Sequence, residues 1–208
     1  MLILRECFIL TVMSMNTNND NVKKAVQDYY ESLAREEIAV KGNAEKITES
    51  LGYKFEQLNS VPKEADLGLG CGNPQERSKP QKGETVLDLG SGRGLDCFIA
   101  SKAVGENGKV FGVDSSRTMV QKASEIAEKN NYKNCTFLYG EIEDIPLTGN
   151  SADLVISNCV INLSVDKPKV YSEIYRVLKA GGRTAISDIT LKKDLPPDWK
   201  SDSSMIKT

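Results

Sequence analysis

A glycine-rich segment between residues 85 and 95 carries the residues best suited to bind a ligand. It runs Thr85-Val-Leu-Asp-Leu-Gly-Ser-Gly-Arg-Gly-Leu95, so β-favouring residues lead into Asp88 and glycines follow at 90, 92 and 94. Glycine permits both a tight turn and a close approach of the backbone to a ligand. The segment therefore predicts a strand that ends in a ligand-binding loop, with Gly90, Gly92 and Gly94 as candidate contacts.

One acid and one substitution in this segment indicate what kind of ligand it takes. Leu95 stands where a dinucleotide-binding G-x-G-x-x-G would need its last glycine, which disfavours a nicotinamide cofactor. Asp88 can compensate an ammonium group, directly or through water. The loop N–H groups, including that of Ser91, and the positive start of the helix that follows suit a carboxylate. Together these features predict a nucleotide-like cofactor that carries a cationic amino acid.

Other candidate cofactor residues follow the later predicted strands. Asp114 is placed to accept two hydrogen bonds from a ribose diol, and Ser115 adjoins it. In the loop 141–146, an acid such as Glu141 or a backbone carbonyl could meet an adenine amino group while Ile142 packs on the ring. Asn158, after the fourth predicted strand, completes the candidate set.

Strands and helices alternate from residue 84 onward. The pattern predicts strands at 85–89, 109–113, 136–139, 152–157 and 183–187, and helices at 95–104, about 116–130 and 167–178, the last ended by Ala180-Gly-Gly182. Such alternation makes a doubly wound parallel sheet covered by helices on both faces. Ligands bind outside the carboxyl ends of such strands, so the loops 89–94, 114–116, 140–145 and 157–163 are expected to converge on one site.

The chain is expected to have four parts. Residues 1–20 are predicted to be a disordered leader. Residues 21–80 are predicted to form an amphipathic helix (21–36) and a loop-rich cap with a short helix at 44–51. Residues 81–190 form the cofactor-binding domain, and 191–208 a short tail.

Composition excludes several classes of function. The 208 residues carry a net charge of −2 without a long basic stripe, which argues against nucleic acid. The apolar start is interrupted by Arg5 and Glu6 and is shorter than the roughly 20 residues that span a membrane. The chain has no histidine, which removes histidine acid–base catalysis, Ser-His triads and most zinc sites. Its five scattered cysteines predict reduced thiols in a cytoplasm, and nothing indicates the oligomeric state.

Several of these motifs together resemble the S-adenosylmethionine-dependent methyltransferases of the Rossmann-like class. The matching segments are Asp88–Gly94, Asp114, Glu141–Pro146 and the turn Leu178–Arg183. Within that class the chain is similar to the arsenite methyltransferases, in a resemblance that extends from about residue 22 to 190. The segments that carry it are Ala65–Pro74, Gly94–Phe98 and Ile156-Ser-Asn-Cys-Val-Ile-Asn-Leu163, of which the last is far more specific than the glycine loop.

This resemblance implies a Rossmann-like class I methyltransferase sheet with strand order 3-2-1-4-5 and S-adenosylmethionine as cofactor. It also implies a small-molecule substrate, arsenite or its thiol conjugates, an external thiol reductant, and a role in arsenic detoxification. Cys71 and Cys159 are implied to bind As(III), since thiolates suit soft centres. The arsenic lone pair would then attack the methyl group in line, without a general base.

Two departures from the family pattern leave alternatives open. The family commonly carries a further cysteine, or a pair, between the first helix and the Cys71 loop, and an arsenic-binding cysteine after the fifth strand; this chain has none at 31–60 and none after the fifth strand. The short C-terminus also leaves out the last two strands of the sheet, so we expect a truncated or divergent member. The alternatives are a methyltransferase for another small molecule, with Cys159 as packing, and a cofactor- or metalloid-binding domain without turnover. Cys97 and Cys135 are expected to be ordinary core residues.

Overall fold

A computed structural model of the chain describes residues 19–35 and 44–190. Most of the leader predicted at 1–20 and all of the tail predicted at 191–208 lie outside the described residues. The helices are α1 (Asn19–Arg35), α2 (Ala44–Ser50), α3 (Phe55–Asn59), η1 (Lys63–Ala65), α4 (Pro74–Ser78), α5 (Leu95–Val104), α6 (Arg117–Lys129), η2 (Ile161–Leu163) and α7 (Lys167–Val177). The strands are β1 (Thr85–Leu89), β2 (Lys109–Asp114), β3 (Cys135–Tyr139), β4 (Ala152–Asn158) and β5 (Leu178–Ser187).

The five strands form one sheet in the order β3-β2-β1-β4-β5. Every neighbouring pair is parallel, and β1 lies in the middle, between β2 and β4. This confirms the predicted parallel sheet and its strand order. The order reverses direction beside β1, which places the glycine loop at the position where such sheets bind ligands.

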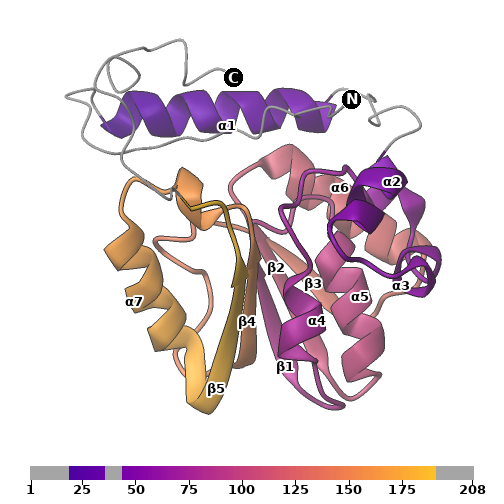
Figure 1. Cartoon of the computed structure of the whole chain (residues 1–208). Helices are drawn as coiled ribbons and strands as arrows, with labels where there is room; N and C mark the ends of the chain where they lie inside the picture. The colour runs from indigo at the N-terminus through magenta and orange to yellow at the C-terminus, as the bar shows by residue number, and fades with distance from the viewer. Residues whose placement is uncertain (1–18, 36–43, 191–208) are drawn as a thin grey trace.

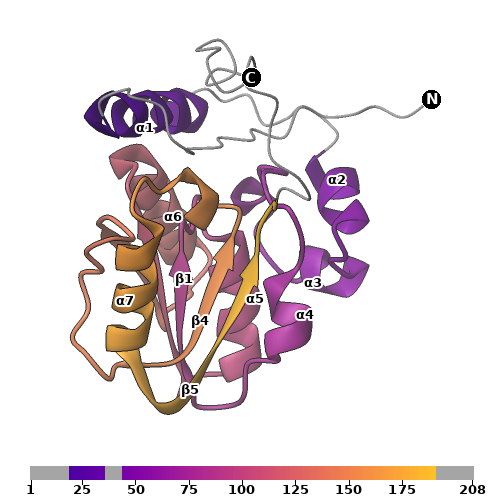
Figure 2. The ribbon, with the colours of Figure 1, turned by 60° about the vertical axis from the view of Figure 1, so that its left-hand side comes forward.

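Helices cover both faces of the sheet (Figures 1 and 2). On one face α5 and α6 pack through Phe98, Ala123 and Ile126 against the even-numbered residues of β1 and β4. On the other face α7 packs through Val170, Ile174 and Val177 against their odd-numbered neighbours. The longest described helix, α1, lies across the carboxyl ends of the strands (Figure 1).

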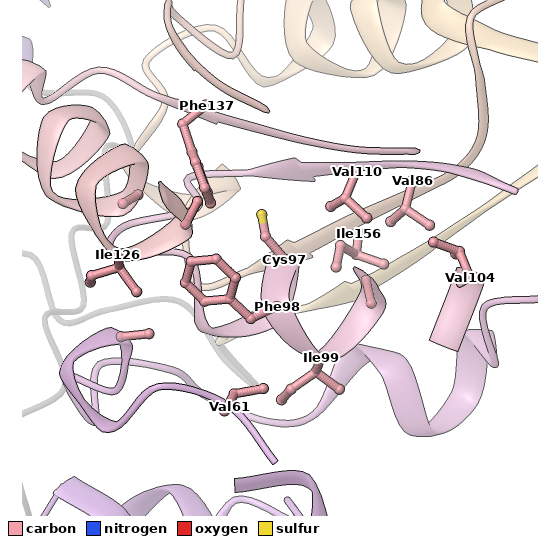
Figure 3. Close-up of a cluster of buried hydrophobic side chains, with 14 of the residues drawn as sticks. Val61, Val86, Cys97, Phe98, Ile99, Val104, Val110, Ile126, Phe137 and Ile156 are labelled. Atoms are coloured by element: carbon pink, nitrogen blue, oxygen red, sulfur yellow. The ribbon is translucent and has the colours of Figure 1, made fainter. Parts of the chain in front are cut away.

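The α5 side of the core is the larger, and it contains a cysteine. Figure 3 shows Cys97 among Phe98, Phe137, Val86 and Ile156. Cys97 is fully buried and its thiol is free, as predicted for a core residue. Burial, the charge of Asp88 and the neighbouring Cys135 raise the pKa of the Cys97 thiol well above its usual value.

The structure differs from the sequence prediction in two places. The cap contains three short helices, α3, η1 and α4. The sequence did not predict them, because glycines and prolines interrupt this region. Each is at most five residues long, too short for a periodic pattern. The second difference is the end of α7: the helix stops at Val177, and residues 180–182 lie within β5 as an irregularity rather than ending the helix. Among the described helices none is long and apolar enough to cross a membrane.

The glycine loop offers a matched test of packing at the start of α5. Gly94 has a φ of +91°, and a Cβ there would come within 2.7 Å of the Phe137 ring. Gly92 has a φ of +52° but open space around it. We expect Gly94→Ala to lower the free energy of unfolding by roughly 2–5 kcal/mol, from backbone strain plus overpacking. Gly92→Ala should cost only the strain, roughly 1–2 kcal/mol. Equal losses in urea unfolding would show that packing against Phe137 contributes nothing.

Candidate cofactor and thiol site

One large cavity opens at the carboxyl ends of β1, β2 and β4, where the four predicted loops converge. Ten of the twelve predicted site residues line it. They are Asp88, Gly90, Ser91, Gly92, Asp114, Ser115, Glu141, Ile142, Asn158 and Cys159. The other two lie beside it: Gly94 begins α5 as its N-cap, and Cys71 is joined to Cys159.

The backbone of the glycine loop is fixed by β2. The N–H groups of Gly90 and Ser91 both donate to the carbonyl of Val113, at 2.8 and 3.1 Å. The N–H of Gly92 donates to Oδ2 of Asp114 at 2.8 Å, and the other carboxylate oxygen accepts the N–H of Ser116 at 2.9 Å. Asp114 therefore ties the loop to the start of α6, and it does so at the edge of the cavity.

Three carboxyl groups are buried in and around this cavity. Burial raises the pKa of Asp88 well above its usual value, and the charge of Asp96 raises it further. Burial likewise raises the pKa of Asp96 and of Asp114. Among the described residues, the side chain of Asp88 accepts one hydrogen bond, from the Cys97 thiol at 3.4 Å. A cationic ligand would stabilise the charged form of these acids, so the cavity favours a cation.

The cavity also suits the other groups of the predicted cofactor. The Ser91 hydroxyl is buried and has no hydrogen-bond partner within the described parts of the chain, so it is available to a ligand. Ile142 is 8% exposed and supplies an apolar wall beside Glu141. The free hydroxyl, the apolar wall and the buried acids suit a polar group, the adenine and the ammonium of the cofactor that the sequence predicts.

Helix α1 closes one side of this cavity through polar contacts. Lys23 pairs with Glu141 at 3.3 Å, and the Gln27 amide donates to the Ser115 carbonyl at 3.2 Å. Glu31 accepts hydrogen bonds from the hydroxyls of Ser116 and Thr118 at the start of α6. Sequence reasoning missed these residues, because an exposed polar helix face carries no sign of what it contacts.

The two predicted arsenic ligands meet at the edge of the cavity. Cys71, in the loop before α4, and Cys159, directly after β4, form a disulfide with Cα atoms 5.7 Å apart. The sequence predicted reduced thiols, and the structure places this pair close enough together to form a disulfide. Cys159 has a φ of +61°, a left-handed conformation that a non-glycine residue adopts at a cost. Among the described residues no group of three or more His, Cys, Asp or Glu side chains could hold a metal ion.

Fold and site together define a class of protein. A family model described as a methyltransferase domain matches residues 80–208, and the chain belongs to that family. The predicted Rossmann-like class I methyltransferase fold is thereby confirmed.

The relatives within this class are more specific. An arsenite methyltransferase of Halobacterium salinarum is 48% identical over 155 residues, which cover 74% of this chain and 40% of that protein. An arsenite methyltransferase of Mus musculus is 37% identical, with 91% of this chain and 53% of that protein covered. The structure of an arsenic (III) S-adenosylmethionine methyltransferase from Chlamydomonas reinhardtii superposes with a TM-score of 0.60 at 37% identity. That match covers 76% of this chain and 54% of the other. The predicted resemblance to arsenite methyltransferases is confirmed, and the chain spans about half the length of these relatives.

Proposed function

We propose that this chain transfers a methyl group from S-adenosylmethionine to trivalent arsenic held by Cys71 and Cys159. The observation that carries the proposal is the meeting of these two cysteines, 88 residues apart in sequence, at the edge of a cavity with buried acids. The similarity to arsenite methyltransferases supports the same substrate. Arsenite methylation is a detoxification reaction, and a cytoplasmic location fits the predicted thiol chemistry.

The cofactor supplies an electrophilic methyl group when it is bound. The residues proposed to hold it are those of the glycine loop and of its neighbours. Asp88 balances the positive charge, and the Ser91 hydroxyl faces its polar groups, while the N–H groups of Gly90, Ser91, Gly92 and Gly94 donate within the protein and fix the shape of the loop. Asp114 and Ser115 hold the ribose. Glu141 and Ile142 hold the adenine, and Asn158 lines the same space.

The thiolates of Cys71 and Cys159 bind the arsenic. Each thiolate donates an electron pair to As(III), which suits a soft ligand, and the arsenic keeps a lone pair. That lone pair would form the bond to the methyl group as the bond from sulfur to methyl breaks, so that S-adenosylhomocysteine leaves and the arsenic becomes formally pentavalent. No proton is removed in that step, so a chain without histidine loses nothing. The gain in rate comes mainly from alignment, which is worth up to roughly 7–11 kcal/mol.

An external thiol reductant is part of this proposal. The two sulfurs form a disulfide in the structure, and a disulfide offers no thiolate to arsenic. Two reductant thiols would reduce it to the two cysteine thiols and become a disulfide themselves. Glutathione or another small thiol would serve.

A panel of methyl acceptors tests the substrate. The chain is incubated with methyl-labelled cofactor, a thiol reductant and either arsenite or one of several small thiols, amines and phenols. We expect label in arsenic products that depends on both Cys71 and Cys159. Label in another acceptor, unaffected by Cys159→Ser, would instead favour a methyltransferase for that compound.

The buried acids predict how cofactor affinity depends on pH. Because the pKa of Asp88 is raised in the free protein, the group is increasingly protonated as the pH falls below that value. The cationic ligand binds the charged form of Asp88, so affinity should fall as the pH is lowered into the range where this carboxyl is protonated in the free protein. Calorimetry should detect protons released on binding in this range. Asp88→Asn should weaken binding at pH 7 and flatten the slope. An unchanged slope would remove Asp88 from the cofactor site.

A further inference from the structure

A buried cluster of polar side chains lies next to the thiol pair. Its centre is the carboxyl group of Asp96, which is 7% exposed and sits in the first turn of α5. Tyr53 donates its hydroxyl to this carboxyl at 2.8 Å, and the Gln75 amide donates to it at 2.8 Å as well. Asn158 Nδ2 lies 3.4 Å from its Oδ2. These donors come from the cap, from α4 and from the end of β4, so Asp96 joins three distant segments.

Asn158 links this cluster to both cysteines. Its Oδ1 accepts the backbone N–H of Cys71 at 2.9 Å, and its Nδ2 donates to the carbonyl of Gly72 at 2.8 Å. The next residue in the chain is Cys159. One side chain therefore holds the backbone on both sides of Cys71, while its own backbone carries Cys159.

The Cys71 loop leaves little room for any other arrangement. A Cβ on Gly70 would come within 2.8 Å of Asn158 Nδ2, and a Cβ on Gly72 would clash with the Ser187 hydroxyl. The carbonyl of Ser187 in turn accepts the N–H of Cys159 at 2.8 Å. Both cysteine backbones are thus seated against the same two residues, Asn158 and Ser187.

The amide of Asn158 must point one way for this to work. If its oxygen and nitrogen were exchanged, Nδ2 would face the N–H of Cys71 and Oδ1 would face the carbonyl of Gly72. The Asp96 carboxyl and the Tyr53 hydroxyl, at 3.0 Å, both lie on the Nδ2 side. A carboxylate there favours the donor end of the amide, and it does so strongly in a site shielded from water.

We propose that Asp96, acting through Asn158, positions Cys71 against Cys159 and so sets the separation of the two thiols. Asp96 and Asn158 are positioning residues in this scheme. The consequence for arsenic rests on the proposed function, but the separation of the two sulfurs does not depend on it.

The thiol–disulfide equilibrium with glutathione measures that separation without arsenic or cofactor. The protein dithiol and one glutathione disulfide exchange to give the protein disulfide and two glutathione thiols, and the equilibrium constant reports how well the two sulfurs are placed. We expect Asn158→Asp to lower this constant roughly 10- to 100-fold, because a second carboxylate would face Asp96 and the Gly72 carbonyl. Asp96→Asn and Tyr53→Phe remove fewer of these contacts and should lower it less.

Asn134→Asp is the matched control. Asn134 also uses its amide across the fold, with Nδ2 donating to the Gly105 carbonyl at 3.1 Å and Oδ1 accepting the Ser101 hydroxyl at 2.6 Å. It precedes β3, at the end of the sheet away from the cavity. Asn134→Asp should lower the free energy of unfolding, as Asn158→Asp does, yet leave the glutathione constant unchanged.

The outcomes separate this proposal from the proposed function. Urea titration first establishes that Asn158→Asp and Asp96→Asn are folded. If both variants then have the glutathione equilibrium constant of the wild type, the positioning role is wrong. Should Asn158→Asp fail to fold, Asp96→Asn and Tyr53→Phe decide the question by the same measurement. If the variants shift the glutathione equilibrium constant as expected but the wild-type chain does not methylate arsenite, the positioning role stands and the proposed function is wrong.

Discussion

Replacing Cys159 by glycine should weaken arsenite binding by orders of magnitude while leaving the reduced protein about as stable as before. Cys159 has a left-handed backbone, which costs a non-glycine residue roughly 1–2 kcal/mol and glycine almost nothing. The gain is offset by the flexibility that glycine adds to the unfolded chain, roughly 0.5–1 kcal/mol. Arsenic affinity should fall roughly 10²- to 10⁴-fold, because one of two linked thiol contacts is lost.

Two further variants make this result specific. Cys159→Ser keeps a side chain on the left-handed backbone and should lose affinity without the relief of backbone strain that glycine gives. Cys135→Ser alters a half-buried thiol at the start of β3 and should leave arsenite binding unchanged. Binding is measured by calorimetry under reducing conditions and stability by urea unfolding. A Cys159→Gly protein that binds arsenite like the wild type would remove Cys159 from the arsenic site.

Replacing Asp114 by alanine should have the largest effect on the cofactor. Its carboxylate holds the N–H of Gly92 and that of Ser116, and it is also the proposed partner of the ribose. Losing a charge-assisted hydrogen bond costs roughly 1.5–3 kcal/mol, or about 10- to 150-fold in affinity. Because Asp114→Ala loses the loop contact as well, we expect the upper end of that range for S-adenosylmethionine, with arsenite binding intact. Asp114→Asn keeps one acceptor oxygen and should lose less.

Asp153→Ala is the control for Asp114→Ala. Its carboxylate also accepts a backbone N–H, that of Thr85 at 2.8 Å, and pairs with Lys179 at 2.7 Å. It lies near the amino end of β4, away from the cavity. The substitution should lower stability and leave cofactor affinity unchanged. Equal losses of affinity in the two variants would mean that destabilisation, not contact, explains the Asp114 result.

The parts of the fold that follow from local signals were predictable. β1 and α5 have the bounds predicted from the β-favouring run, the three glycines and Gly105. Ser116 caps α6, which begins near the predicted position of about 116, and its hydroxyl accepts the N–H of Met119. Each of these signals lies within a few residues of the structure that it determines, so the sequence alone carries it.

The contacts around the thiols could not be predicted in the same way. Tyr53 and Asp96 are 43 residues apart, and Asn158 reaches Tyr53 across 105. The residues around Tyr53 do not indicate which side chain it contacts. Asp96 has the sequence context of an ordinary acid in the first turn of a helix. Asn158 was predicted as a cofactor residue, and that role stays a prediction. Its amide contacts with the Cys71 loop became visible only once β4 and the cap were placed together.

A single-turnover experiment on arsenic-loaded protein tests the central claim most directly. The reduced chain is loaded with one As(III) per molecule, freed of excess arsenite, and mixed with S-adenosylmethionine before the arsenic species are separated. The account predicts one monomethylated arsenic per loaded chain in the wild type and none in Cys159→Gly, which cannot be loaded. Unmethylated arsenic as the sole species, in a chain that binds both arsenite and the cofactor, would contradict it and leave a binding domain without turnover.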